Sequence, residues 1–450
     1  MCAKIPIRLV TCAAVAALFL VLPAVATRGQ SNGAWVTGWA ASVQGPYPVG
    51  NASAQPDLSA VFPSPDRGAR DQSFRLIVRP DIWGPSTRVR LSNAFNTRPV
   101  TIDGVYVGVQ MSGSAILKGT NQAVTFDKKP AVTIPAGASA WSDAVALPFW
   151  RPAADATLAG RKLAVSFHVA GESGPMTWHA KALTTSYVTL PGAGSRGQDE
   201  REEAFRASTT SWYFLDAVDM MAPRGTRLIV AFGDSITDGT ASTLNGDDRW
   251  PDVLSRRLHA VHGDAISVVN AGIGGNRVTG PAEYSVQTPF SGGPSAGQRL
   301  ERDVLSLSGL SAVIWLEGIN DFSRAANAGV DLVQRAMRDV VDRLRAKDVR
   351  VFGATLTSAV GSASGGDGPS ETDAKRRALN EFIRTSGVFD GVFDFDRATL
   401  DPATGAMREE FVPNSTVGGA GDHLHPNRLG YAAMGQAIDL SLLMAPPRRR

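Results

Sequence analysis

Four short segments in the second half of the chain carry side chains that could act together on an acyl carbon. The first is the Gly-Asp-Ser tripeptide at 233–235, which ends an apolar run that starts at Leu228. The others are residues 270–275, 318–321 and 422–425, which contribute glycines, an asparagine, and an aspartate with two histidines. Acyl transfer requires a nucleophile, oxyanion donors, and a base with an orienting carboxylate. The sequence therefore predicts this chemistry.

Ser235 is the candidate nucleophile. A serine hydroxyl is almost wholly protonated at neutral pH, so it needs a base within hydrogen-bond reach. His425 is the candidate base, because Asp422 can accept from one ring nitrogen and leave the other for the serine proton. His423 is an alternative base, but its side chain follows that of Asp422 directly, whereas the spacing of His425 suits a carboxylate that folds back onto the ring.

Three groups are candidate oxyanion donors: the backbone N–H of Ser235, the backbone N–H of Gly275 and the side-chain amide of Asn320. Such donors stabilise the transition state by about 3 kcal/mol each. A glycine at 275 lets the backbone approach the substrate closely, and Gly274 is an alternative for this role. Asp321 is a rival for the orienting acid, but it directly follows Asn320 and is expected to cap or brace that loop.

The remaining polar motifs favour neither a metal nor a nucleotide. The Gly-X-Gly-X-X-Gly pattern is not satisfied after the first strand, and Gly-Lys-Thr/Ser is absent, so nucleotide binding is disfavoured. Four aspartates have no fixed ligand spacing and are expected to serve as turn and cap residues: Asp234, Asp238, Asp247 and Asp248. Four other histidines are expected to have no carboxylate arrangement like that of His425: His168, His179, His259 and His262.

These segments are expected to lie on an open α/β sheet, because strand-like and helix-like runs alternate after Arg227. The predicted strands are 228–232, 266–270, 312–316, 349–356 and 391–395, and the clearest helical face runs from Val330 to Leu344. Another helix is expected at 429–443, opened by Pro426 and Asn427. Alternating strands and helices predict a doubly wound parallel sheet, in which ligands bind at the carboxyl ends of the strands.

The first half of the chain, from Trp35 to about Met221, has period-two runs separated by Pro, Gly, Asn and Asp, which predicts a β-sandwich of jelly-roll type. Residues 191–209 are predicted to form a mobile loop. Seven of the nine tryptophans fall in this half, and core packing and a carbohydrate-stacking platform are both open explanations for them. The length and the apolar fraction of 43% predict two domains with separate cores.

The chain begins with a short basic stretch, an apolar run from about Leu9 to Leu22 and small residues up to Ala26, which predicts a cleaved signal peptide at 1–26. Cys2 and Cys12 are the only cysteines, so the exported protein is expected to contain no thiol. No later segment reaches the roughly 18 apolar residues that a membrane span needs. The net charge of +3 does not favour a nucleic-acid partner.

The quoted motifs resemble the SGNH hydrolases, also called GDSL-type esterases or lipases. The signature residues of that family are matched by Ser235, by Gly275, by Asn320 and by His425 with Asp422, over about Arg227 to Met444. The resemblance implies a flavodoxin-like three-layer fold, no metal or organic cofactor, and hydrolysis of carboxylic esters through an acyl-enzyme. Some carbohydrate esterases of the family carry a β-sandwich before the catalytic domain, and this chain resembles that arrangement.

The expected organisation is therefore a signal peptide at 1–26, a β-sandwich domain at 27–222, a catalytic domain at 227–444 and a basic tail at 445–450. The favoured function is a secreted or periplasmic serine esterase that removes short acyl groups from a small molecule or a polysaccharide. A lipase or lysophospholipase is an alternative, although loops 280–297 and 358–369 are rich in Gly, Ser and Pro rather than apolar residues. A carbohydrate-binding protein with an inactive hydrolase domain is the alternative outside enzymes.

Overall fold

The computed structural model describes residues 1–3, 33–151, 156–362 and 369–445. Residues 1–32 form a unit separate from the compact unit 33–450, and only residues 1–3 of that first unit are described. Most of the predicted signal peptide and the tail from residue 446 onward thus lie outside the described residues. The predicted domain boundaries stay predictions.

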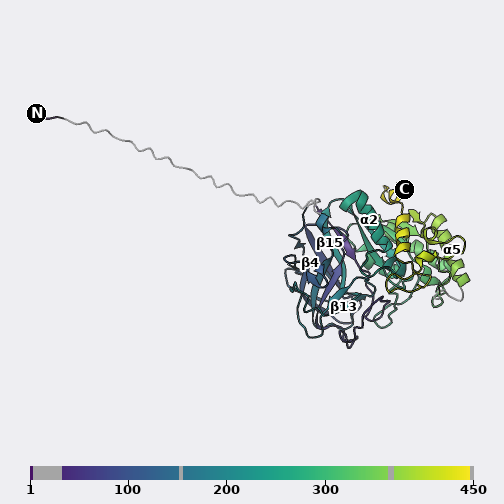
Figure 1. The fold of residues 1–450 in the computed structure, drawn as a ribbon, viewed down its shortest axis with the longest axis horizontal. Coiled ribbons are helices and arrows are strands. Elements are labelled where there is room, and N and C mark those ends of the chain that lie inside the picture. Colours follow the sequence, from purple (N-terminus) through teal and green to yellow (C-terminus); the bar gives the residue numbers. More distant parts are fainter. Residues whose placement is uncertain (4–32, 152–155, 363–368, 446–450) are drawn as a thin grey trace. The chain divides into compact units, whose positions relative to one another are not determined.

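The first half of the compact unit is built from antiparallel strands (Figure 1). One sheet has the order β1-β15-β3-β8, with β9 also paired to β3. Its strands are Gly33–Ala40 (β1), Leu215–Pro223 (β15), Ser86–Ser92 (β3), Ser139–Trp141 (β8) and Val145–Ala146 (β9). The strands alternate buried and exposed positions where one face meets solvent, which is the pattern that predicted them.

A second antiparallel sheet has the order β13-β12-β2-β10-β4-β5, and both β6 and β7 pair with β4. Its strands are Ala207–Thr209 (β13), Ser186–Val188 (β12), Arg70–Val78 (β2), Leu163–Glu172 (β10), Val100–Ser112 (β4), Ala115–Ile116 (β5), Gln122–Ala123 (β6) and Ala131–Ile134 (β7). Two short strands pair separately, Trp178–His179 (β11) with Trp212–Tyr213 (β14). Strand β13 lies within residues 191–209, so the predicted loop is wrong at its end, where Ala207–Thr209 pairs with β12.

The second half contains a five-stranded parallel sheet in the order β17-β16-β18-β19-β20. The strands are Arg227–Gly233 (β16), Ile266–Gly272 (β17), Leu310–Leu316 (β18), Arg350–Ala354 (β19) and Gly391–Phe393 (β20), close to the predicted ranges. Numbered along the chain, this order is 2-1-3-4-5, which is the flavodoxin-like order. The strand order reverses between β16 and β18, and a ligand crevice is expected at their carboxyl ends.

Helices connect and cover these strands. They are Ser235–Asp238 (α1), Trp250–His262 (α2), Ala296–Leu300 (α3), Val330–Arg345 (α4), Pro369–Thr385 (α5), Phe395–Thr399 (α6), Arg428–Ala437 (α7) and Leu440–Met444 (α8). Helix α2 packs on α7, and α4 packs on α3 and α5. The predicted fold class, an all-β region before an α/β region with a parallel sheet, is confirmed.

The predicted helix at 429–443 is two helices, because α7 ends at Ala437 and α8 begins after Asp439. The side chain of Asp439 accepts hydrogen bonds from the backbone N–H groups of Ser441 and Leu442 and so starts a new helix. The opening of α7 agrees with the prediction, since Asn427 caps it.

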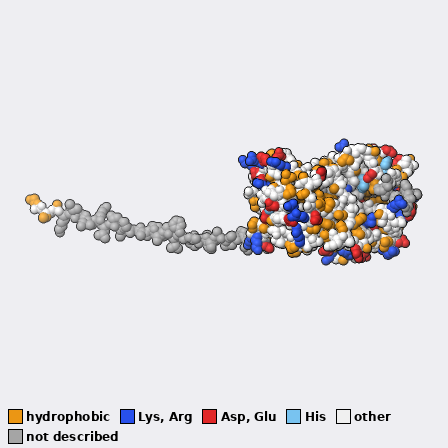
Figure 2. Space-filling view, turned by 90° about the horizontal axis from the view of Figure 1, so that it is seen from below, with side chains coloured by type: hydrophobic (Ala, Val, Ile, Leu, Met, Phe, Trp, Pro, Cys, Tyr) orange, Lys and Arg blue, Asp and Glu red, His pale blue; other side chains and the backbone are white. Residues whose placement is uncertain are grey.

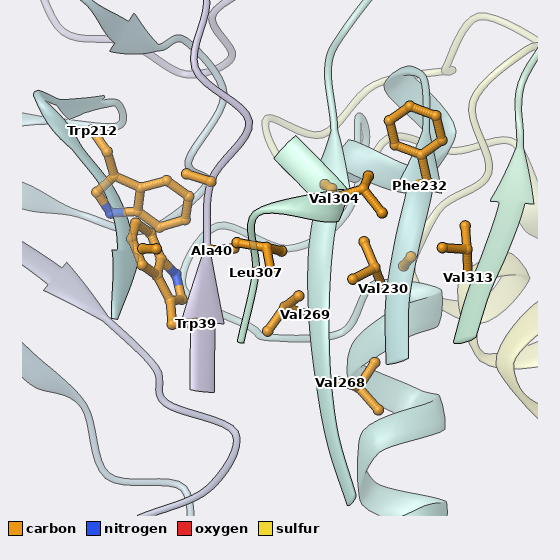
Figure 3. Packing of buried hydrophobic residues seen from close by; sticks show 14 of the residues in the cluster. Trp39, Ala40, Trp212, Val230, Phe232, Val268, Val269, Val304, Leu307 and Val313 are labelled. Carbon is orange, nitrogen blue, oxygen red and sulfur yellow. The ribbon is translucent and has the colours of Figure 1, made fainter. Parts of the chain in front are cut away.

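The two halves share one hydrophobic core rather than two separate cores. Buried side chains of β1 and β14, such as Trp39 and Trp212, belong to the same continuous cluster as Val268, Val269 and Leu307 of the α/β half (Figure 3). The prediction of separate cores is wrong because β1 lies directly against β17 and buries its apolar face there. The β-rich half therefore packs on the sheet that carries the predicted site.

Polar contacts reinforce this junction. The carboxylate of Asp81, in the loop after β2, accepts from the backbone N–H of Val268 at 2.6 Å and from His259 Nε2 at 3.1 Å. Ser308 and Thr37 exchange hydrogen bonds of 3.0 Å through their backbone and side-chain groups. The junction thus combines apolar burial with hydrogen-bonded edges, as a domain interior does.

The surface of the compact unit carries both signs of charge. On the face shown in Figure 2, basic and acidic side chains are interspersed with apolar ones, consistent with the small net charge of +3. Among the described residues, no helix is long and apolar enough to cross a membrane.

Candidate active site

Ser235 lies at the first position of α1, directly after β16, and it is 5% exposed. Asp234 caps this helix, because its side chain accepts from the backbone N–H of Ile236 at 3.0 Å. A Cβ at Gly233 would lie 2.1 Å from the backbone oxygen of Leu316, so only glycine fits where the chain turns out of the sheet. The strand-to-helix turn therefore presents the hydroxyl at the edge of the sheet where the strand order reverses.

His425 lies beside this hydroxyl. Its Nε2 is 2.8 Å from the Oγ of Ser235, and its Nδ1 is 2.6 Å from Oδ2 of Asp422. The other carboxylate oxygen of Asp422 accepts from the backbone N–H groups of Leu424 and His425, at 3.0 and 2.9 Å. The structure thus brings together the three residues that the sequence predicts as nucleophile, base and orienting acid.

The same contacts keep Asp422 ionised. Partial burial opposes the negative charge, but the hydrogen bonds from His425 and Leu424 and the charge of the imidazole hold the pKa of this carboxyl below its usual value. An ionised carboxylate can only accept hydrogen bonds, so Nδ1 of His425 must carry the proton in that contact. Nε2 is then free to take the proton of Ser235.

His423, the alternative base, lies against the loop at Gly361. Its backbone has a positive φ of 57°, and its ring lies 3.5 Å from the position that a Cβ on Gly361 would occupy. His425, in contrast, lies in the loop before α7. The side chain of Asn427 caps this helix, because its Oδ1 accepts from the backbone N–H of Leu429 at 2.9 Å. The geometry therefore favours His425 over His423.

The hydrogen bonds of the glycine loop distinguish Gly275 from Gly274. The backbone N–H of Gly274 donates to Oδ2 of Asp238 at 2.9 Å, so it is already engaged. Gly275 has φ = 81°, a left-handed conformation that favours glycine. Among the described residues its N–H has no hydrogen-bond acceptor within reach. Gly275 is therefore the better candidate for the oxyanion donor.

Asn320 lies in a short 3₁₀ turn after β18, and its side-chain amide donates to the backbone oxygen of Asn276 at 3.0 Å. Its amide group has a second N–H for a substrate. Asp321 braces the neighbouring loop, because its carboxylate accepts from the backbone N–H groups of Val278 and Thr279 at 2.9 Å each. This agrees with a bracing role rather than an orienting one, and it ties the Asn320 turn to the glycine loop.

Arg299 holds the strand ends beneath the site, and no sequence motif pointed to this residue. Its fully buried guanidinium donates to the backbone oxygens of Gly233 at 2.7 Å and Ala271 at 2.8 Å, which end β16 and β17. It also donates to Oδ1 of Asn276 at 2.7 Å. One side chain thus holds together the two strand ends and the loop that bear Ser235 and Gly275.

Three of the other histidines do have carboxylate partners, so that prediction is wrong. His168 lies between Asp103 and Asp71, at 2.8 and 2.9 Å, and His259 between Asp81 and Asp264, at 3.1 and 3.3 Å. His179 is buried, with Nε2 3.0 Å from Oδ1 of Asp238. Apart from Asp264, which lies five residues after His259, these partners come from distant parts of the chain, where no local spacing reveals them.

The four aspartates without ligand spacing also differ from one another. Asp234 caps α1, and Asp248 accepts from the backbone N–H of Thr243 at 3.0 Å, as turn and cap residues do. Asp247 forms an ion pair with Lys162 at 3.3 Å. Asp238 instead joins His179 of the β-rich half to the backbone of Gly274, which is a wider role than a cap.

The arrangement can carry out acyl transfer in two steps. His425 takes the proton of Ser235 while the hydroxyl oxygen attacks the acyl carbon, and the N–H groups of Ser235, Gly275 and Asn320 are the candidate donors to the oxyanion. The alcohol then leaves with that proton. Water, activated by the same imidazole, releases the acid from the acyl-enzyme.

Comparison with known proteins agrees with this arrangement. Residues 231–433 match the model of the GDSL-like lipase/acylhydrolase family, a range that starts in β16 and ends in α7. This region therefore has the SGNH hydrolase fold, with an antiparallel β-rich region before it. Residues 231–433 thus form a GDSL-like lipase/acylhydrolase domain, which confirms the predicted resemblance, and the protein is a carboxylic ester hydrolase.

Solved structures similar to this chain include three esterases. A carbohydrate acetylesterase family member from Sinorhizobium meliloti is 17% identical, with 48% of this chain and 98% of that one covered and a TM-score of 0.37. An acetyl xylan esterase is 17% identical, with 47% and 96% covered and a TM-score of 0.34. The aryl esterase of M. smegmatis is 16% identical, with 47% and 95% covered and a TM-score of 0.34. No curated protein matches the chain in sequence.

Proposed function

We propose that the protein is an exported serine esterase that releases short acyl groups, in particular acetyl groups, from an acylated carbohydrate. The observation that carries the serine mechanism is the continuous hydrogen-bonded chain from Asp422 through His425 to the hydroxyl of Ser235. A nucleophile, its base and an orienting carboxylate in contact are the signature of covalent acyl transfer.

The preference for short acyl groups rests on the surroundings of Ser235. The hydroxyl-bearing residue is only 5% exposed, and the side chain of His425 is 14% exposed, so the nucleophile is recessed. The candidate donors to the substrate are polar or small, the backbone N–H of Gly275 and the side-chain amide of Asn320, and Asn51 lies against the glycine loop. A long acyl chain needs an apolar trough, and these groups do not provide one.

The acyl chain-length profile tests this proposal. With p-nitrophenyl esters, kcat/KM for the acetate is expected to exceed that for the octanoate by at least about tenfold, because a small pocket excludes the added methylenes. A preference for eight carbons or more would instead indicate a lipase. Acetylated xylan, pectin and peptidoglycan are then assayed for released acetate with Ser235→Ala as the control, and acetate from none of them would remove the carbohydrate part of the proposal.

The tryptophans of the β-rich half add little to the case for a carbohydrate substrate. Trp39, Trp178 and Trp212 are buried in the core, as core packing requires. Trp35 and Trp141 are half-buried, but the guanidinium of Arg88 lies over both rings, at 4.8 and 4.3 Å. Support for a sugar substrate comes instead from the polar groups around Ser235, which suit a hydroxyl-rich alcohol.

Export is proposed from the basic and apolar segment at 1–26. When the full chain is expressed in a bacterium with a general secretion system, we expect the protein outside the cytoplasm to begin at Thr27. N-terminal sequencing or intact-mass measurement of that fraction checks this. Retention of the whole chain in the cytoplasm with Met1 or Cys2 still present would contradict export.

A further inference from the structure

The β-rich half reaches into the glycine loop that carries the candidate oxyanion donor. Asn51, in the segment after β1, donates its side-chain amide to the backbone oxygen of Gly274 at 2.6 Å. The two residues are 223 positions apart in the chain. This contact therefore exists only because the β-rich half and the parallel sheet are packed together.

The hydrogen bond falls on the peptide group that matters for the oxyanion. The carbonyl of Gly274 and the N–H of Gly275 belong to one planar, trans peptide, in which the oxygen and the hydrogen point in opposite directions. A donor on the oxygen therefore fixes the direction of the N–H. It also polarises the peptide and makes that N–H a stronger donor, as in other chains of hydrogen bonds.

The other side of Gly274 is held by Asp238 of α1, which in turn contacts the β-rich half. The N–H of Gly274 donates to Oδ2 of Asp238, while Oδ1 of Asp238 lies 3.0 Å from Nε2 of His179 in β11. Nδ1 of His179 is 2.7 Å from the backbone oxygen of Ser42, so both ring nitrogens face acceptors. Burial works against charge on this ring, but Asp238 raises the pKa of His179 above its usual value. Hydrogen bonds thus hold both the backbone oxygen and the backbone N–H of Gly274.

Space around the glycine loop is limited by the same residues. A Cβ at Gly275 would lie 2.6 Å from Nδ2 of Asn51, and one at Gly274 would lie 3.2 Å from Nζ of Lys181. The ammonium of Lys181 donates to Oγ1 of Thr240 at 2.6 Å. Asn51 and Lys181 of the β-rich half therefore pack directly against the glycine loop.

We propose that Asn51 is a positioning residue for the reaction, which aims the backbone N–H of Gly275 at the oxyanion. The β-rich half is then part of the catalytic apparatus, and not only a cover or a binding module. This inference rests on the proposed esterase mechanism at Ser235.

The test uses the full chain and p-nitrophenyl acetate. Asn51→Ala is expected to lower kcat by about tenfold to a hundredfold while KM changes less than about twofold, because the lost contact acts on the transition state. Asn51→Asp keeps the shape but places an acceptor against the carbonyl of Gly274, so a larger loss is expected. The inhibition constant of phenylboronic acid, which forms a tetrahedral adduct with a nucleophilic serine, is expected to rise by the same factor as kcat/KM falls.

Asp81→Ala is the matched control. It removes hydrogen bonds between the two halves, to Val268, His259 and Ser255, but none to the glycine loop. We expect it to lower the melting temperature and to leave kcat within about twofold of wild type. Thermal melting of all variants separates weakened docking of the two halves from a misaligned oxyanion donor.

The outcomes are distinct. Full kcat in Asn51→Ala and Asn51→Asp would overturn the inference and leave the proposed function intact. An equal loss of activity in Asn51→Ala and Asp81→Ala, in proportion to lost stability, would show that Asn51 only docks the two halves. If wild-type protein hydrolyses no ester faster than Ser235→Ala, the proposed function fails, and this inference with it.

Discussion

Replacing Ser235 by alanine is expected to lower kcat for ester hydrolysis by about 10⁶-fold, and His425→Ala by a similar factor. The hydroxyl and the imidazole are 2.8 Å apart and act as one unit, because the base has nothing to activate without the nucleophile. The double variant is therefore expected to be no less active than either single variant. Initial rates with p-nitrophenyl acetate, measured against the buffer reaction, check both statements.

Asp422→Asn is expected to cost less, about 10⁴-fold in kcat. The amide keeps an oxygen for the backbone N–H groups of Leu424 and His425, but its NH₂ group would face Nδ1 and favour the wrong tautomer of His425. His423→Ala is the control, because that ring faces Gly361 and is expected to be dispensable within about tenfold. If His423→Ala lost as much activity as His425→Ala, the assignment of His425 as the base would be wrong.

The positions of the candidate catalytic residues could be predicted because each follows a recognisable strand or helix boundary. The apolar run before Gly233 is buried along almost its whole length, as a central parallel strand requires. Gly275 and Asn320 follow β17 and β18, the two neighbours of β16. Parallel strands end at one edge of a sheet, so residues distant in the chain meet there by topology alone.

The contacts that support the site could not be predicted in this way. Asn51 and His179 come from the β-rich half, and no spacing in the sequence links them to Gly274 or Asp238. Arg299 lies in a short amphipathic segment, where an arginine is usually solvated. Each of these residues has its role because of tertiary packing, which no local pattern of the sequence encodes.

The shared core was missed for a similar reason. Strand β1 reads as an ordinary strand of an antiparallel sheet, and its pairing with β15 satisfies that reading. Both of its faces are buried from Val36 to Ala40, because the strand also lies against β17 of the α/β half. Composition alone gave enough apolar residues for two cores but no information on whether they would merge.

Arg299→Met is expected to lower the free energy of unfolding by about 3–5 kcal/mol, because it removes one partner of a buried ion-pair network. Arg299 lies 3.3 Å from Asp303 and 4.0 Å from Glu317, and the side chains of both acids are almost fully buried. Methionine fills a similar volume but leaves these carboxylates without that cation. It also leaves the backbone oxygens of Gly233 and Ala271 without its hydrogen bonds. Chemical denaturation at fixed pH measures the loss.

The loss is expected to grow with pH. Burial raises the pKa of Glu317 to about 7 even with Arg299 present, against an ordinary value of 4.5, and removal of the guanidinium raises that pKa further. The folded state then holds a proton on Glu317 that the unfolded state has released, so the contribution of Glu317 to stability is greatest below about pH 4.5 and falls as the pH rises through the folded-state pKa. The deficit of Arg299→Met should therefore be larger at pH 8 than at pH 5. Adding Glu317→Gln should remove much of this difference, because the amide does not titrate, and a deficit independent of pH in Arg299→Met would contradict the role assigned to the Arg299–Glu317 pair.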